Sequence, residues 1–150
     1  MTITAPPVSL YEQDLLLWTE ETIRHLEAKN FEELDLDNLI EEIVALGRSE
    51  RKELKSRLLV LFEHLLKRLY VPIPLEYNGW ERTIREQRIQ LELVLEVSPS
   101  LKHQWQESCE QAWRLALKKV KGDYPDTESP NTIPFSTERL TLLNQDFWQS

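Results

Sequence analysis

The sequence predicts an all-α protein, an up-and-down helical bundle of four main helices with a short C-terminal helix. Apolar residues recur at three- and four-residue spacing along most of the chain, and no segment shows the alternation of a β-strand. Only three glycines occur, each where a helix could end or bend. A chain of 150 residues suits one domain that needs no disulfide or metal to bury a core. We therefore expect a single domain over residues 1–150, with a flexible N-terminus over residues 1–9.

The first helix is expected over roughly residues 10–29. Ser9 and Glu12 form a capping box at its start, because the serine side chain can cap the helix while the glutamate reaches back. Asn30 suits the left-handed position that ends many helices.

A second, central helix is expected to begin with Asp37 as its cap, because the next proline is Pro72. About 34 residues would make a helix about 50 Å long, so we expect a bend or break near Gly47 and Ser49. Residues 58–62 are apolar on all sides, which places this half of the helix at the centre of the bundle. The predicted core stripe comprises Leu36, Ile40, Ile43, Gly47, Glu50, Leu54, Leu58, Leu61, Leu65 and Leu69.

The proline-containing residues 71–79 are expected to form a rigid connector. A third helix should cover about residues 80–97. A fourth should begin at Ser98-Pro99 and stop at Gly122. Residues 123–135 hold three prolines and should be irregular, and Ser136 could cap a last short helix through Leu143. The predicted core stripes are Trp80, Ile84, Arg88, Leu91 and Leu95 on the third helix, and Leu101, Trp105, Cys109, Ala112, Ala116 and Val120 on the fourth.

The net charge of −8 is unevenly distributed. Residues 1–42 carry −9, residues 43–121 carry +5 and residues 122–150 carry −4. An acidic chain is a poor general binder of nucleic acid, although a basic patch of Arg48, Arg51, Lys52 and Lys55 leaves that possibility open. We favour the interpretation that the acidic and basic segments pack beside each other. The same patch could instead touch an acidic partner.

Three features of the sequence predict a soluble, cytoplasmic protein. No apolar run approaches the length of about 20 residues that spans a bilayer, and residues 1–7 lack the pattern of a signal peptide. Cys109 is the only cysteine, which fits a reducing compartment.

Familiar catalytic motifs, such as a glycine-rich phosphate loop, paired cysteines or a zinc-binding His-Glu-x-x-His, are missing from the sequence. Polar residues do occur on or beside the predicted core faces. A buried charge needs a partner or a cleft, so two interpretations stay open: an ion pair between Glu50 and Arg88 that sets helix register, or a polar interhelical site. The candidate site residues are Glu42, Glu50, His64, Gln87 and Arg88.

No cofactor is predicted, but two metal arrangements deserve a test. Glu50 and His64 are the candidate ligands for a divalent metal in the polar site. The three histidines, His25, His64 and His103, fall on three predicted helices, as in metal sites of helical bundles, but without the local ligand pair typical of zinc.

Several ordered blocks resemble the bacterial domain-of-unknown-function family twenty-nine, over about residues 10–121. They are Tyr11-Glu-Gln-Asp14 with Trp18, residues 34–43, Gly47-Arg-Ser-Glu50, His64-Leu-Leu-Lys67, Trp80 with Thr83-Ile84 and Gln87-Arg88, and Ser98-Pro-Ser-Leu101. The resemblance implies a small α-helical bacterial protein and no particular activity. Arg68 and Gly79 depart from the family pattern, which has an aromatic residue and a serine there.

The leading functional hypothesis is a non-enzymatic helical bundle that acts through protein contacts, as a homo-oligomer or a small regulatory partner. The alternative is a metal-dependent hydrolase or nuclease, in which Glu42 and Glu50 bind the metal, His64 binds it or acts as a base, and Arg88 steadies an anionic substrate. The alternative requires these groups to converge on open solvent.

Overall fold

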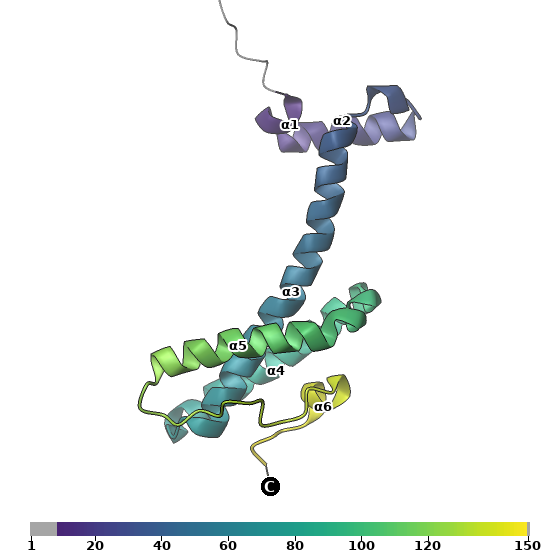
Figure 1. Cartoon of the computed structure of the whole chain (residues 1–150). Helices are drawn as coiled ribbons and strands as arrows, with labels where there is room; N and C mark the ends of the chain where they lie inside the picture. The colour runs from purple at the N-terminus through teal and green to yellow at the C-terminus, as the bar shows by residue number, and fades with distance from the viewer. Residues whose placement is uncertain (1–8, 150) are drawn as a thin grey trace, which may run out of the picture. The chain divides into compact units, whose positions relative to one another are not determined.

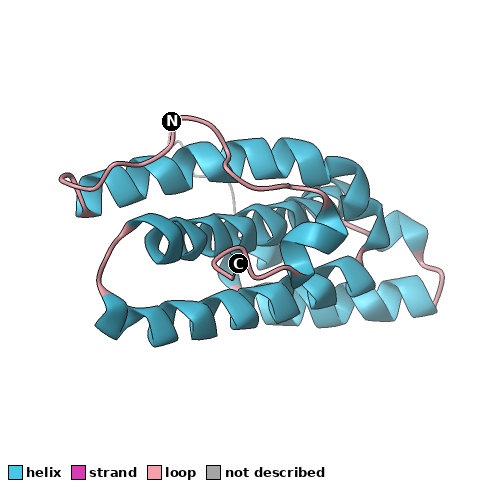
Figure 2. Ribbon diagram, turned by 90° about the horizontal axis from the view of Figure 1, so that it is seen from below, coloured by secondary structure: helices cyan, strands magenta, loops and turns pink. Residues whose placement is uncertain are grey.

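The computed structural model describes residues 9–149, and every regular element in that range is a helix. The predicted all-α helical bundle is confirmed (Figures 1 and 2). None of these helices is both long and apolar enough to cross a membrane. The expected flexibility of residues 1–8 lies outside the described range. The elements are α1 (Leu10–Gln13), α2 (Leu15–Glu27), η1 (Phe31–Glu33), α3 (Leu36–Tyr70), α4 (Pro74–Val97), η2 (Pro99–Gln104), α5 (Trp105–Asp123) and α6 (Arg139–Asn144).

The chain divides into two compact units, residues 1–47 and residues 48–150. The division falls beside Gly47, but α3 continues through Gly47 and Ser49 as one helix. The helix is therefore not broken here, and a bend near Gly47 stays a prediction. One glycine inside a helix costs only about 1 kcal/mol relative to alanine, which a helix of 35 residues absorbs. A single folding domain stays a prediction.

The hydrophobic core of the second unit forms between the C-terminal half of α3, α4, α5 and α6. Leu58, Leu61 and Phe62 are completely buried there, which confirms that residues apolar on all sides mark the centre. The predicted stripes of α4 and α5 are also buried, including the tryptophans at positions 80 and 105. Figure 1 shows α4 and α5 beside this half of α3.

The first unit has almost no buried core. Only Trp18 and Thr22 are buried among residues 9–47, and Tyr11 packs edge-on against Trp18 with ring centroids 4.9 Å apart. The stripe residues Leu36, Ile40 and Ile43 are 55%, 56% and 59% exposed. Their prediction as core is wrong, because none of residues 9–149 covers these three side chains.

Helix boundaries in the first unit differ from the prediction where polar side chains cap the backbone. Asp14 ends α1 and caps α2, its carboxylate accepting a hydrogen bond of 3.0 Å from the amide of Leu17. One expected helix thus becomes two. Lys29, rather than Asn30, adopts the left-handed conformation, with φ of 59°.

The start of α3 is also set by a different residue. Asp35, rather than Asp37, accepts hydrogen bonds from the backbone and side-chain nitrogens of Asn38, at 3.4 and 2.7 Å. Three later helix boundaries also differ from the prediction. Helix α4 begins at Pro74, because proline is tolerated in the first turn of a helix. Helix α5 continues through Gly122, and Glu138 caps α6 in place of Ser136.

The C-terminal segment folds back onto the second unit. The Phe135 ring stacks on Phe62 and on Phe147, with ring centroids 5.8 and 4.8 Å apart. The indole nitrogen of Trp105 donates a hydrogen bond of 2.8 Å to the carbonyl oxygen of Thr137. Phe147 and Trp148 are partly buried against the core, as expected for a tail that packs on its own bundle.

Candidate functional site

Arg88, the most buried of the predicted site residues, holds the C-terminal segment. Its guanidinium donates to the carbonyl oxygen of Leu142 at 3.1 Å, to a carboxylate oxygen of Asp146 at 2.9 Å and to the carbonyl oxygen of Gln145. Only 6% of Arg88 is exposed, and burial lowers its pKa, opposed by the contact with Asp146. A guanidinium with three partners at the end of α6 is a structural clamp.

The expected ion pair between Glu50 and Arg88 is wrong. Glu50 instead accepts a hydrogen bond of 3.1 Å from the hydroxyl of Ser98, at the end of α4. The partners of Arg88 lie on the C-terminal segment, which carries no periodic pattern that could have revealed them.

Gln87 and His64 also have local partners. The side-chain oxygen of Gln87 accepts a hydrogen bond of 3.4 Å from Arg57, which is paired with Glu53 at 2.9 Å. His64 Nδ1 lies 2.8 Å from the carbonyl oxygen of Val60. A carbonyl can only accept, so Nδ1 carries the proton, and Nε2 keeps its lone pair in the neutral ring. Burial lowers the pKa of His64, which favours this neutral form.

Glu50 and His64 cannot bind one metal ion together. They lie fourteen residues apart on the same helix, a separation of about 21 Å at 1.5 Å per residue. Among residues 9–149, no group of three or more histidine, cysteine, aspartate or glutamate side chains is placed to hold a metal ion. The three-histidine arrangement is likewise not assembled in this range.

Glu42 belongs to the first unit, whereas the other four candidates belong to the second. Its carboxylate accepts a hydrogen bond from the phenol of Tyr11, which links α1 to α3. That hydrogen bond, together with burial and the neighbouring acids, raises the pKa of Tyr11. Each predicted site residue therefore has a hydrogen-bond partner of its own.

A buried charged cluster that sequence reasoning missed lies between α3 and α5. The carboxylate of Glu63 is 3.0 Å from Lys67 Nζ and 3.2 Å from Lys119 Nζ, and its side chain is 6% exposed. Burial pushes the pKa of Glu63 upward, but the hydrogen bonds from both lysines outweigh it and hold that pKa below its usual value. The four-residue spacing of Glu63 and Lys67 was the available signal.

Arg68, one of the two departures from the family pattern, also has a structural setting. Its guanidinium carbon lies 3.9 Å from the ring centroid of Tyr77 and 5.5 Å from that of Trp148. Its Nε is 3.6 Å from the carboxylate of Glu81. The planar guanidinium thus makes a cation–π contact with the Tyr77 ring.

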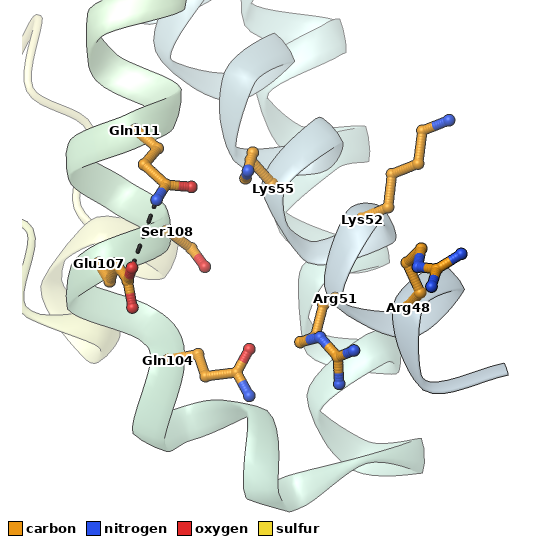
Figure 3. A pocket seen from close by; sticks show the side chains of 8 residues that line it. All are labelled: Arg48, Arg51, Lys52, Lys55, Gln104, Glu107, Ser108 and Gln111. Atoms are coloured by element: carbon orange, nitrogen blue, oxygen red, sulfur yellow. Dashed lines mark hydrogen bonds between the residues drawn. The ribbon is translucent and has the colours of Figure 1, made fainter. Parts of the chain in front are cut away.

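The basic patch forms one wall of an open groove in the second unit (Figure 3). The groove has a volume of about 450 Å³. Figure 3 shows Arg51 and Lys55 extending toward the gap between α3 and α5, while Arg48 and Lys52 extend away from α5. The opposite wall is polar and carries one acid, Glu107, which accepts a hydrogen bond of 3.4 Å from Gln111. The lining residues are Arg48, Arg51, Lys52, Lys55, Gln104, Glu107, Ser108 and Gln111.

None of the four cations of this groove has an ion pair among the described residues. By contrast, the buried charges Glu63 and Arg88 each form ion pairs with oppositely charged side chains. The groove is thus a place in the second unit where unpaired cations line open surface, and it suits an anionic group.

A comparison with protein families settles the relationship suggested by the ordered blocks. The family model described as "Domain of unknown function DUF29" matches residues 10–148. The chain belongs to this family. The match extends beyond the blocks seen in the sequence and includes α6 and the segment that Arg88 holds. Neither the comparison with curated proteins nor that with solved structures gives a match.

Proposed function

We propose that this DUF29 protein acts by binding another protein chain through its first unit. The observation that supports this proposal is the density of exposed apolar side chains there. Of eighteen large hydrophobic residues that are exposed in the described chain, eleven lie in residues 9–47. They are Leu15, Leu16, Leu17, Ile23, Leu26, Phe31, Leu36, Ile40, Ile43, Val44 and Leu46.

Exposed apolar surface of this density is unfavourable in water and marks a binding surface in soluble proteins. On α2, Leu16 is 71% exposed and Ile23 is 48% exposed, seven residues apart and so on one face of the helix. On α3, the spacing that gives a buried core after Leu54 continues backward into exposed Ile43 and Ile40. A helical partner that continues this packing would cover both faces.

The finer expectations on location are part of the same proposal. We infer that the chain works in a reducing, cytoplasmic compartment, because its only cysteine, Cys109, is fully buried in the core. A thiol buried in this way is poorly reactive, because burial disfavours the thiolate form.

The proposal is tested with the variant Leu16→Ser/Ile23→Ser, which changes two side chains already exposed to solvent. The native mass at micromolar concentration and the proteins captured from native lysate are compared for the variant and the wild type. We expect the variant to keep its thermal stability within a few degrees and to lose its bound partner, whether a second copy or another protein. A wild type that is strictly monomeric and captures nothing contradicts the proposal. The matched control is Leu75→Ser, on α4, where the leucine is 96% exposed.

A further inference from the structure

The groove between α3 and α5 lies entirely within the second unit, because its eight lining residues all fall between positions 48 and 111. Its two walls differ in chemistry. The wall from α3 carries the four cations of the basic patch, and none of them has an ion pair or a side-chain hydrogen bond among residues 9–149. The facing wall, from η2 and α5, is polar and consists of Gln104, Glu107, Ser108 and Gln111.

The four cations form two pairs that differ in direction. Arg51 and Lys55 extend toward the gap between α3 and α5 (Figure 3). Arg48 and Lys52 extend away from α5. The members of each pair are four residues apart, which places them about 6 Å apart along the helix. The first pair is therefore the one placed to contact a molecule inside the groove.

The facing wall offers both donors and acceptors of hydrogen bonds. Gln104 and Ser108 extend toward the same gap from the other side (Figure 3). Ser108 is only 7% exposed, and its hydroxyl has no hydrogen-bond partner among the described residues. The carboxylate of Glu107 accepts one hydrogen bond of 3.4 Å from Gln111 and keeps further acceptor capacity. A ligand that matches both walls thus carries anionic groups for the cations and N–H donors for these acceptors.

An acidic peptide segment meets both requirements. Its carboxylates pair with arginine and lysine, and its backbone N–H groups donate to carboxylate and amide oxygens. In an extended peptide, alternate side chains point to the same face about 6.6 Å apart, which is close to the spacing of Arg51 and Lys55. The phosphodiester groups of a nucleic acid are acceptors only. In addition, none of the described residues that line the groove has an aromatic ring on which a base could stack.

We propose that this groove binds an extended acidic segment of a partner protein, with acidic residues at alternate positions paired with Arg51 and Lys55. Arginine can hold a carboxylate through two parallel hydrogen bonds, so Arg51 fixes the position of the segment. The volume of about 450 Å³ is that of a ligand pocket, which admits a short segment and not a folded domain. This site belongs to the second unit and is additional to the first-unit surface of the proposed function. Exposed ion pairs are screened by salt, so binding weakens as ionic strength rises.

The test measures how a fluorescein-labelled peptide of alternating glutamate and serine binds the full chain, by fluorescence anisotropy at low and at physiological salt. We expect the wild type to bind this peptide and not the peptide in which glutamine replaces glutamate. Arg51→Ala/Lys55→Ala should weaken binding by about tenfold or more, because both ion pairs inside the groove are lost.

The matched control is Arg48→Ala/Lys52→Ala, which removes the same charge from the same helix but from side chains that extend away from α5. It should weaken binding by no more than about threefold, through the loss of long-range attraction. Circular dichroism melts show whether both variants keep the fold. Equal weakening by the two variants means general attraction to positive charge and overturns the inference. A wild type that does not bind the acidic peptide, or that binds a labelled oligothymidylate more tightly, overturns it as well.

A second measurement needs no substitution in the protein. The same peptide, with a photoreactive residue in place of one serine, is crosslinked to the wild type, and the adducts are located by mass spectrometry. We expect adducts within residues 48–55 and 104–111, the two walls of the groove. Adducts confined to other segments mean that the peptide binds elsewhere, and the inference is then wrong.

Discussion

Arg88→Ala should be among the most destabilising single changes in the second unit. The substitution removes the donor from the carbonyl oxygens of Leu142 and Gln145 and leaves Asp146 without its cation. Hydrogen bonds to charged groups contribute about 1.5–3 kcal/mol each. The pair with Asp146 is worth less, about 1 kcal/mol or below, because 38% of that side chain is exposed.

Since these contributions are not additive, we expect a loss of about 3 kcal/mol in the free energy of unfolding. For a chain of this size that corresponds to a fall in melting temperature of roughly 6–12 °C. Urea denaturation followed by circular dichroism measures the free energy. Limited proteolysis should also show faster cleavage within residues 124–138, because the segment loses its clamp.

Two variants bracket this result. Arg85→Ala changes an exposed arginine three residues away and should alter stability by no more than about 0.5 kcal/mol. Arg88→Lys keeps the charge but lacks the planar fork of donors, so it should fall between the wild type and alanine. If Arg88→Ala costs less than about 1 kcal/mol, the reasoning that this residue is a structural clamp is refuted.

Three further predictions follow from the other buried groups. The folded pKa of Glu63 lies below its unfolded value, so the stability that Glu63 contributes is present above the unfolded pKa and is lost as pH falls through the folded pKa. Urea denaturation between about pH 6 and pH 3 should therefore show a smaller loss of stability in acid for Glu63→Gln than for the wild type. Equal losses for the two proteins would argue against this role of Glu63. Burial raises the pKa of Cys109 to about 12, so a thiol reagent at neutral pH should label it only after unfolding, and rapid labelling of the folded chain would contradict its burial. Glu50 and His64 lie too far apart to bind one metal ion, so the melting temperature in magnesium, manganese, zinc or nickel should equal that in chelator. A metal at 100 times its dissociation constant would add about 2.7 kcal/mol of stability, a shift of several degrees. Such a shift, abolished by His64→Ala, would support the metal site instead.

Hydrophobic periodicity predicts the fold well where the apolar residues of a helix are buried in the core. Residues 58–62 are apolar on every side, and such a segment has no stable position except a core. The stripes of α4 and α5 were predicted correctly for the same reason, even though one of them includes Arg88.

The first unit shows what periodicity cannot predict. An apolar stripe indicates a face suited to burial, but it does not identify what covers that face. Leu36, Ile40 and Ile43 continue the spacing of the α3 core and are nevertheless exposed. The same residues that made the core prediction wrong there provide the surface on which the proposed function rests.

The partners of the polar candidates could not be predicted, for a different reason. Sequence patterns select charged residues on buried faces, but each partner is chosen by tertiary contacts. Arg88 pairs with Asp146, fifty-eight positions later, and Glu50 with Ser98, forty-eight positions later. Local pairs such as Glu63 with Lys67 could be predicted from their spacing.

The central claim, that the first unit is a protein-binding surface, is tested most directly by site-specific photo-crosslinking in cells that express the full chain. A photoreactive amino acid replaces Leu16 in one variant and, as a control of equal or greater exposure, Leu75 in another. We predict a discrete crosslinked adduct from position 16 and none from position 75, and the mass of the adduct distinguishes a second copy from a different protein. Equal crosslinking from both positions, or none from position 16, would contradict the claim.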